Sequence, residues 1–112
     1  MITITIIKKN QKIITVEANG HSGYAEHGAD IICSAVSTLT QNLINSLTEI
    51  AKIDAKYMID ESIPHLSVTI PLDLSKEDMN TSQLFMKSAV LGLKNLANSY
   101  TKYIKIKEIY ND

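Results

Sequence analysis

The side chains that could do chemistry gather in one short stretch of this sequence, residues 20–37. Cys33, the single cysteine of the chain, is the candidate nucleophile, and His21 is the candidate base. A neutral imidazole within hydrogen-bond reach of a thiol takes its proton, and the same imidazole later protonates a leaving amine. These two residue types therefore predict nucleophilic catalysis through a thiolate–imidazolium pair.

A helix is expected to begin beside the cysteine and to favour its thiolate. Asp30 precedes a run with helical periodicity, so its carboxylate is a candidate N-cap that accepts hydrogen bonds from the unpaired amides of the first turn. Cys33 would then lie in that first turn, where these amides and the positive end of the helix dipole stabilise an anion. Ser37 follows four residues later on the same helix face, so we predict its hydroxyl near the sulfur.

Glycines space the segment between the histidine and the helix. Gly20, Gly23 and Gly28 are three of the four glycines in the chain. They would let the loop turn sharply and bring His21 back over the helix terminus. The same glycines would let a substrate backbone approach closely, and a loop of this kind can act as a lid.

Each of these residues also has a simpler interpretation. A lone cysteine is often a small buried hydrophobic residue, Asp30 can be a helix cap without a catalytic role, and Ser37 can be an ordinary polar helix residue. His27 is expected to be a solvated loop residue, with the alternative that it replaces His21 as the base. His65 opens a strand and is expected to be inert.

The same side chains could instead bind a metal. His21, His27 and Cys33, with Asp30, are possible ligands of a catalytic zinc. Each successive pair among the first three is six residues apart, a spacing that matches no standard short metal-ligand pattern. Neither a G-x-G-x-x-G sequence nor a P-loop with its lysine is present, so phosphate binding by the glycines is disfavoured. We therefore predict no metal and no cofactor.

Periodicity predicts the elements that would position these residues. Residues 2–8 and 13–19 have the alternation or β-rich composition of strands, joined by a KKNQK hairpin turn. Apolar residues then recur at helical spacing; they are Ile32, Val36, Leu39, Leu43, Leu47 and Ile50.

The second half of the chain repeats this succession of a hairpin and a helix. Residues 55–61 and 66–72 are predicted to form a hairpin, in which Pro71 places the second strand at an edge or ends it. A helix is expected from about Asn80 to Tyr100, although Ser75 with Asp78 also resembles a capping box. Residues 104–110 alternate again. The order ββαββαβ predicts an α+β sandwich, a largely antiparallel sheet packed against two helices in a single domain, 1–112.

Composition narrows the class of protein. The chain has 112 residues, 45% of them hydrophobic, and a net charge of −1, which is typical of one globular domain and argues against a nucleic-acid binder built on a basic field. No apolar run approaches the roughly 18 residues of a membrane span, and MITITIIKKN alternates where a signal peptide would be uniformly apolar. With one cysteine, we expect a free thiol in a reducing compartment.

The stretch around the cysteine resembles the ribosomal-processing cysteine protease family, Prp. Members carry a Gly-His pair, a glycine-containing loop, and then G-x-D-I-[IV]-C-x-x-[AV]-S at the start of a helix. Here these residues are Gly20-His21, Gly23 and residues 28–37, GADIICSAVS. The chain length and the ββαββαβ order fit this family over essentially the whole sequence.

The resemblance implies a cytoplasmic, homodimeric endopeptidase with a Cys33–His21 dyad. Such enzymes remove the short N-terminal extension of large-subunit ribosomal protein twenty-seven in Firmicutes and related bacteria, cutting after an aromatic residue. Asp30 and Ser37 would support the site. Two other functions compete with this hypothesis: a ribosome-associated binding module that does not cut, and a zinc-dependent hydrolase.

Overall fold

The structure, a computed structural model, describes residues 1–20, 29–60 and 65–111, which form a five-stranded sheet with two long helices. The strands are β1 (Ile2–Lys9), β2 (Lys12–Asn19), β3 (Lys56–Asp60), β4 (His65–Thr69) and β5 (Ile104–Tyr110). The helices are α1 (Ala29–Asn45), which continues into a π-helical segment η1 (Ser46–Ile50), and α2 (Lys76–Ser99).

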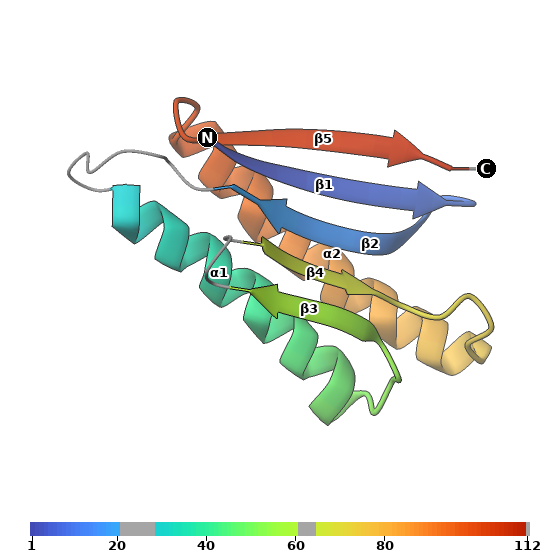
Figure 1. Ribbon diagram of the computed structural model, residues 1–112. Coiled ribbons are helices and arrows are strands. Elements are labelled where there is room, and N and C mark those ends of the chain that lie inside the picture. Colours follow the sequence, from blue (N-terminus) through green and yellow to red (C-terminus); the bar gives the residue numbers. More distant parts are fainter. Residues whose placement is uncertain (21–28, 61–64, 112) are drawn as a thin grey trace.

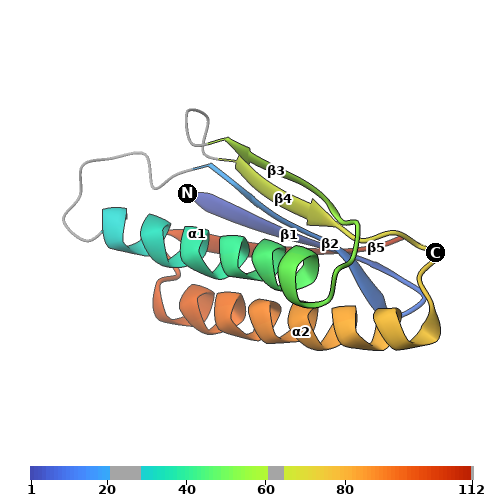
Figure 2. The same cartoon turned by 90° about the horizontal axis from the view of Figure 1, so that it is seen from below.

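The sheet is mixed, with one parallel pair. Its strand order is β3-β4-β2-β1-β5, and neighbouring strands are antiparallel except for β1 and β5. Both helices lie on the same side of the sheet (Figures 1 and 2). The predicted α+β class and the element order ββαββαβ are therefore confirmed.

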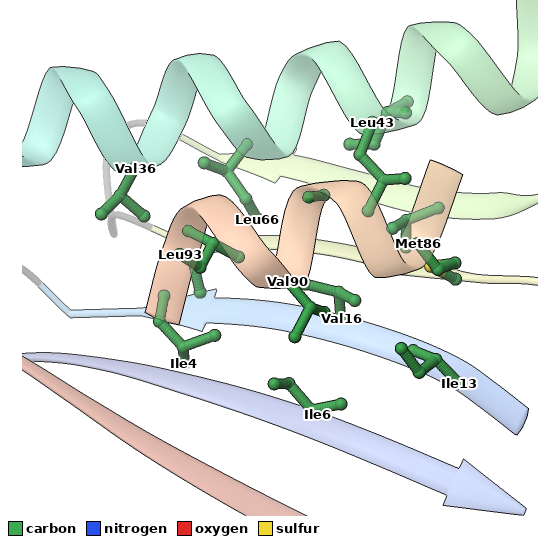
Figure 3. Packing of buried hydrophobic residues seen from close by; sticks show 14 of the residues in the cluster. Ile4, Ile6, Ile13, Val16, Val36, Leu43, Leu66, Met86, Val90 and Leu93 are labelled. Atoms are coloured by element: carbon green, nitrogen blue, oxygen red, sulfur yellow. The ribbon is translucent and has the colours of Figure 1, made fainter. Parts of the chain in front are cut away.

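The core fills the space between the sheet and the helices. Because side chains alternate across a strand, every second residue of β1 faces the helices. These residues are apolar and buried, as the alternation of residues 2–8 predicts. Figure 3 shows side chains from both layers meeting there; those fully or nearly fully buried include Ile4, Ile6, Val16, Val36, Leu43, Met86 and Leu93.

A buried amide fastens α2 to the β1–β2 hairpin. The Gln83 side chain accepts a hydrogen bond from the Ile13 backbone N–H at 2.8 Å and donates one to the Ile13 carbonyl at 2.9 Å. The register of β1 and β2 shifts between Ile7 and Lys8, close to this position. Gln83 therefore pairs backbone groups beside an irregularity of the ladder, where they would otherwise be buried without partners.

Two predicted boundaries are wrong. The helix α2 begins at Lys76 rather than near Asn80, because Ser75 caps it and accepts a hydrogen bond from the Asp78 N–H at 3.1 Å. The strand predicted over residues 66–72 ends at Thr69, before Pro71, and it is an inner strand. Proline lacks the N–H that continued pairing with a neighbour would need, so of the two alternatives for Pro71 the strand end is observed.

The last predicted core position of the first helix also differs. Ile50 is 70% exposed, whereas Leu47 is fully buried. The chain is π-helical here, and the Ala51 N–H bonds to the Ser46 carbonyl five residues earlier. This wider turn changes the angular position of the residues that follow, so the period that holds up to Leu47 no longer places Ile50 on the core. Ile53 is buried instead.

Candidate active site

Cys33 lies near the start of α1, partly buried against the core and outside any disulfide. The described part of the helix begins at Ala29, so Asp30 lies within the helix and not in the capping position before it. This corrects the predicted N-cap: an N-cap residue lies outside the helix, and the helix includes Ala29, two residues before the start that the sequence pattern indicates. Cys33 accordingly opens the second turn, with the unpaired amides of the first turn just ahead of it.

A pocket of about 340 Å³, the Cys33 pocket, opens beside the thiol. It lies where α1 passes the start of β1 and β4 and the end of β2 and β3. One part of its wall is apolar and belongs to the core: Ile2, Ala18, Val36 and Leu66. The remaining lining residues are Gly20, Cys33, Ser34, Ser37, Thr38, Asp60 and His65. The thiol is thus at the boundary between an apolar wall and a polar rim.

Ser37 lines this pocket together with Cys33. The four-residue separation puts both on one face of α1, as predicted. The Ser37 hydroxyl accepts a hydrogen bond from the Gln41 side-chain amide at 2.8 Å. Because this bond uses a lone pair and not the hydroxyl proton, Ser37 remains able to donate toward a group in the pocket.

Gly20 directly follows β2 and lines the same pocket. Its φ is +91°, and a Cβ placed there would lie 2.7 Å from the Met1 carbonyl oxygen. Both the backbone angle and the close approach of the first residue require glycine. His21 follows directly, but it lies outside the described residues together with Gly23, His27 and Gly28, so the predicted base, its alternative and the loop glycines stay predictions.

A hydrogen bond between side chains that the sequence did not predict lies on the other face of the sheet. His65 Nε2 and Glu17 Oε1 are 2.6 Å apart. Leu66, the neighbour of His65 in β4, is buried toward the helices, so the His65 side chain projects from the opposite face of the sheet, although the residue also contributes to the rim of the Cys33 pocket. Alternation marks both residues as occupants of the polar face, but only the strand order β4-β2 brings them together. His65 thus has a structural partner in Glu17, which its position at the start of a strand does not indicate.

Asp60 is a second residue that sequence reasoning missed. It is the last residue of β3, it is half-buried, and it lines the Cys33 pocket. In the strand register it lies opposite His65. No local pattern singles out this residue, because its place in the pocket lining depends on how β3 packs beside β4.

The described residues meet the requirements of neither a metal site nor a membrane-spanning helix. Across residues 1–20, 29–60 and 65–111, no three His, Cys, Asp or Glu side chains are grouped so that they could hold a metal ion. The predicted alternative zinc site includes His21 and His27 and so lies outside this range. Neither helix that the structure describes is long and apolar enough to span a membrane.

Known proteins resemble this chain over nearly its full length. The protein "Ribosomal processing cysteine protease Prp" of Bacillus subtilis is 25% identical over 107 residues, which cover 95% of this chain and 96% of that protein. The protein of the same name from Mycoplasma pneumoniae is 28% identical over 95 residues, or 85% of this chain and 87% of that protein.

Solved structures share the fold. SMU.848 from Streptococcus mutans aligns with a TM-score of 0.87 and 32% identity, covering 99% of this chain and 96% of that one. The ribosomal processing protease Prp from S. aureus, solved in complex with a substrate peptide, aligns with a TM-score of 0.82 and 19% identity over 96% of this chain and 99% of that one. The family model "Cysteine protease Prp" matches residues 1–105. The chain therefore belongs to the ribosomal-processing cysteine protease family Prp, as its motif predicted, and is a cysteine-type protease.

Proposed function

We propose that this protease removes the N-terminal extension of large-subunit ribosomal protein twenty-seven with a Cys33–His21 dyad. The observation that carries the proposal is the shared pocket: Cys33 lines it from α1, and Gly20, the residue directly before His21, lines it from the end of β2. Gly20 thus lies at the pocket that contains the thiol, and the predicted base is the next residue in the sequence. Curated relatives named for ribosomal processing support the choice of substrate.

The reaction follows from this placement. His21 takes the Cys33 proton, and the sulfur attacks the scissile carbonyl carbon. Backbone amides at the start of α1, left unpaired by the helix geometry, would stabilise the oxyanion. His21 then protonates the departing amine, and a water molecule that His21 deprotonates hydrolyses the thioester and frees the enzyme.

The pocket suits an apolar side chain next to the scissile bond. Ile2, Val36 and Leu66 supply a wall of aliphatic carbon, and a volume of about 340 Å³ is in the range of small-ligand sites. An aromatic residue of the extension would remove this wall from water, which favours binding. Cleavage after an aromatic residue is therefore part of the proposal.

Asp30 and Ser37 are assigned supporting roles. Asp30 belongs to the helix turn that supplies the oxyanion amides. Ser37, held by Gln41 at 2.8 Å, keeps its hydroxyl proton for the sulfur or the oxyanion. Gly20, Gly23 and Gly28 would form the hinge points of the loop over the substrate. We propose that the enzyme acts as a cytoplasmic homodimer without a cofactor, and without direct contact with nucleic acid or membrane.

The test is cleavage of a peptide that spans the extension junction, read by mass spectrometry. We expect one cut after an aromatic residue, and loss of product with Cys33→Ala and with His21→Ala. Lys105→Ala is the control, since this lysine is exposed on β5 at the opposite edge of the sheet and lies outside the Cys33 pocket. Full cleavage by a folded Cys33→Ala variant would refute the mechanism.

Two further results would point to the competing functions. Peptide binding without any cut in the wild-type protein would favour a binding module. Loss of cleavage on chelation, with stoichiometric zinc in protein purified without chelator, would favour the zinc hydrolase.

A further inference from the structure

An exposed outer strand leads into the Cys33 pocket. β3 pairs with β4 and forms one edge of the sheet (Figure 1). Its three central side chains are large and apolar, yet Tyr57 is 56%, Met58 49% and Ile59 43% exposed. An edge strand carries unpaired backbone N–H and C=O groups, and an exposed apolar one is a template for another strand.

The opposite edge of the sheet is built differently. β5 carries Lys105, Lys107 and Glu108 within its length, and charges of this kind discourage pairing with a further strand. In β3 the charged residues, Lys56 and Asp60, occupy only the two ends. The edge that approaches Cys33 is thus the one without charges along its middle.

The register of β3 shows which of its side chains lie on the helix-facing side of the sheet, the side of Cys33. Tyr57 lies opposite Val68, and Ile59 lies opposite Leu66. Both β4 partners are buried toward the helices, and directly opposed residues share one face of a sheet. Tyr57 and Ile59 therefore project on the side of α1, where Cys33 lies. The next residue, Asp60, already lines the pocket.

We propose that β3 binds the substrate of this protease as an additional β-strand, so that an extended peptide runs along the sheet edge and delivers its scissile bond to Cys33. The proposal rests on the proposed peptidase function and specifies how the peptide is held. The occupant is an extended segment with alternating apolar side chains, because continuity of β3 with the pocket aligns such a segment with the thiol.

In this binding mode, hydrogen bonds between the backbones provide affinity, and contacts between side chains provide specificity. Alternate β3 residues direct their N–H and C=O groups outward and would bond to every second residue of the peptide. Peptide side chains on the helix-facing side would contact Tyr57 and Ile59. A continuous strand from this edge into the pocket would also fix which peptide bond reaches Cys33.

The test is an N-methyl scan of the cleaved peptide. One backbone nitrogen at a time is methylated on both sides of the scissile bond, leaving the two residues that flank that bond unchanged, and kcat/KM is measured. Strand addition predicts a period of two, in which alternate methyl groups lower kcat/KM by roughly tenfold and the others have little effect, since each sensitive position loses one backbone hydrogen bond and gains a clash. The side on which the alternation appears gives the direction of the bound strand.

A pair of protein variants tests the side-chain contacts. We expect Ile59→Thr to raise KM for the peptide by about two- to fivefold with kcat retained, as for loss of a cross-strand apolar pair. Ile109→Thr on β5 is the matched control: Ile109 is 37% exposed on the opposite edge strand, and its substitution should leave KM unchanged.

The outcomes separate this proposal from the peptidase function. If the wild-type protein does not cut the unmodified peptide, the proposed function fails, and substrate binding by strand addition, which rests on it, fails with it. If it cuts but kcat/KM shows no alternation on either side of the bond, strand addition is refuted while the peptidase stands. An Ile59→Thr variant that changes the oligomeric state and leaves KM unchanged would assign the edge to a second copy of the chain and would likewise overturn the proposal.

Discussion

Gly20→Ala tests the claim that the end of β2 can be closed only by glycine. At φ +91° an L-residue is strained, at a cost of about 1–2 kcal/mol. The new Cβ would also lie 2.7 Å from the Met1 carbonyl oxygen, and since this neighbour is backbone, β1 must shift to relieve the contact. Such overpacking adds about 1 kcal/mol. We expect a loss of about 2–3 kcal/mol in the free energy of unfolding.

Gly92→Ala is the matched control, because it makes the same chemical change within α2. A Cβ at Gly92 would meet the Leu39 side-chain methyls at 3.2 and 3.3 Å. These atoms belong to a partly buried side chain that can move by a few tenths of an ångström. Alanine favours the helix over glycine by about 0.8–1 kcal/mol, which offsets the contact. We expect no loss of stability, or a small gain.

Thermal denaturation followed by circular dichroism measures both variants. A loss of 2–3 kcal/mol in a domain of this size lowers Tm by about 10 °C, and the protein should still be folded at 25 °C because small domains have about 5–15 kcal/mol of stability. Gly92→Ala should melt at or above the wild-type temperature. Equal Tm values for Gly20→Ala and wild type would refute the strain argument, and equal losses in both variants would show that the space around each glycine is irrelevant.

Three further predictions concern residues outside the pocket. Gln83→Leu leaves the buried backbone groups of Ile13 without their amide partner, so urea denaturation should show a loss of about 2–4 kcal/mol; a loss below 0.5 kcal/mol would contradict this role. A hydrogen bond and charge attraction from Lys94, together with attraction from Lys8, lower the pKa of Glu108 below its ordinary value of 4.5. The Glu108 carboxylate should therefore stabilise the fold above about pH 4.5 and lose that effect as the pH falls through its lower folded pKa. Lys94→Met should flatten the pH dependence of Tm below pH 5, and an unchanged profile would contradict this role. Gln11 has φ +67° in the β1–β2 turn, so Gln11→Gly should raise Tm by a few degrees, worth up to about 1 kcal/mol, whereas a lower Tm would show that chain entropy outweighs the strain.

Local periodicity predicts most of the fold because the core is built from it. The alternation of Ile2, Ile4 and Ile6 places one face of β1 on the helices, and all three are buried. The helical spacing that relates Cys33 to Ser37 is equally local, so their shared place in the pocket follows from the sequence. Such patterns involve a few consecutive residues and do not depend on how elements pack.

The features that sequence reasoning missed depend on packing between distant segments. Glu17 and His65 are 48 residues apart and meet because β4 pairs with β2. Asp60 reaches the pocket because β3 is the outer neighbour of β4. The predicted start of the first helix is wrong for a smaller reason: a difference of two residues at the start of α1 moves Asp30 from the capping position into the helix.

The apolar wall of the Cys33 pocket belongs to the buried core, whereas part of its polar rim is exposed. Ile2, Val36 and Leu66 line the pocket and also belong to the buried core, so truncating Leu66 to alanine to enlarge the pocket would cost about 2–5 kcal/mol, a large part of the stability of a small domain. Ser34 and Thr38 line the same pocket but are exposed, so they can change with little effect on folding. Differences in substrate preference among proteins with this fold are therefore expected to arise at the polar rim, while the apolar wall is retained.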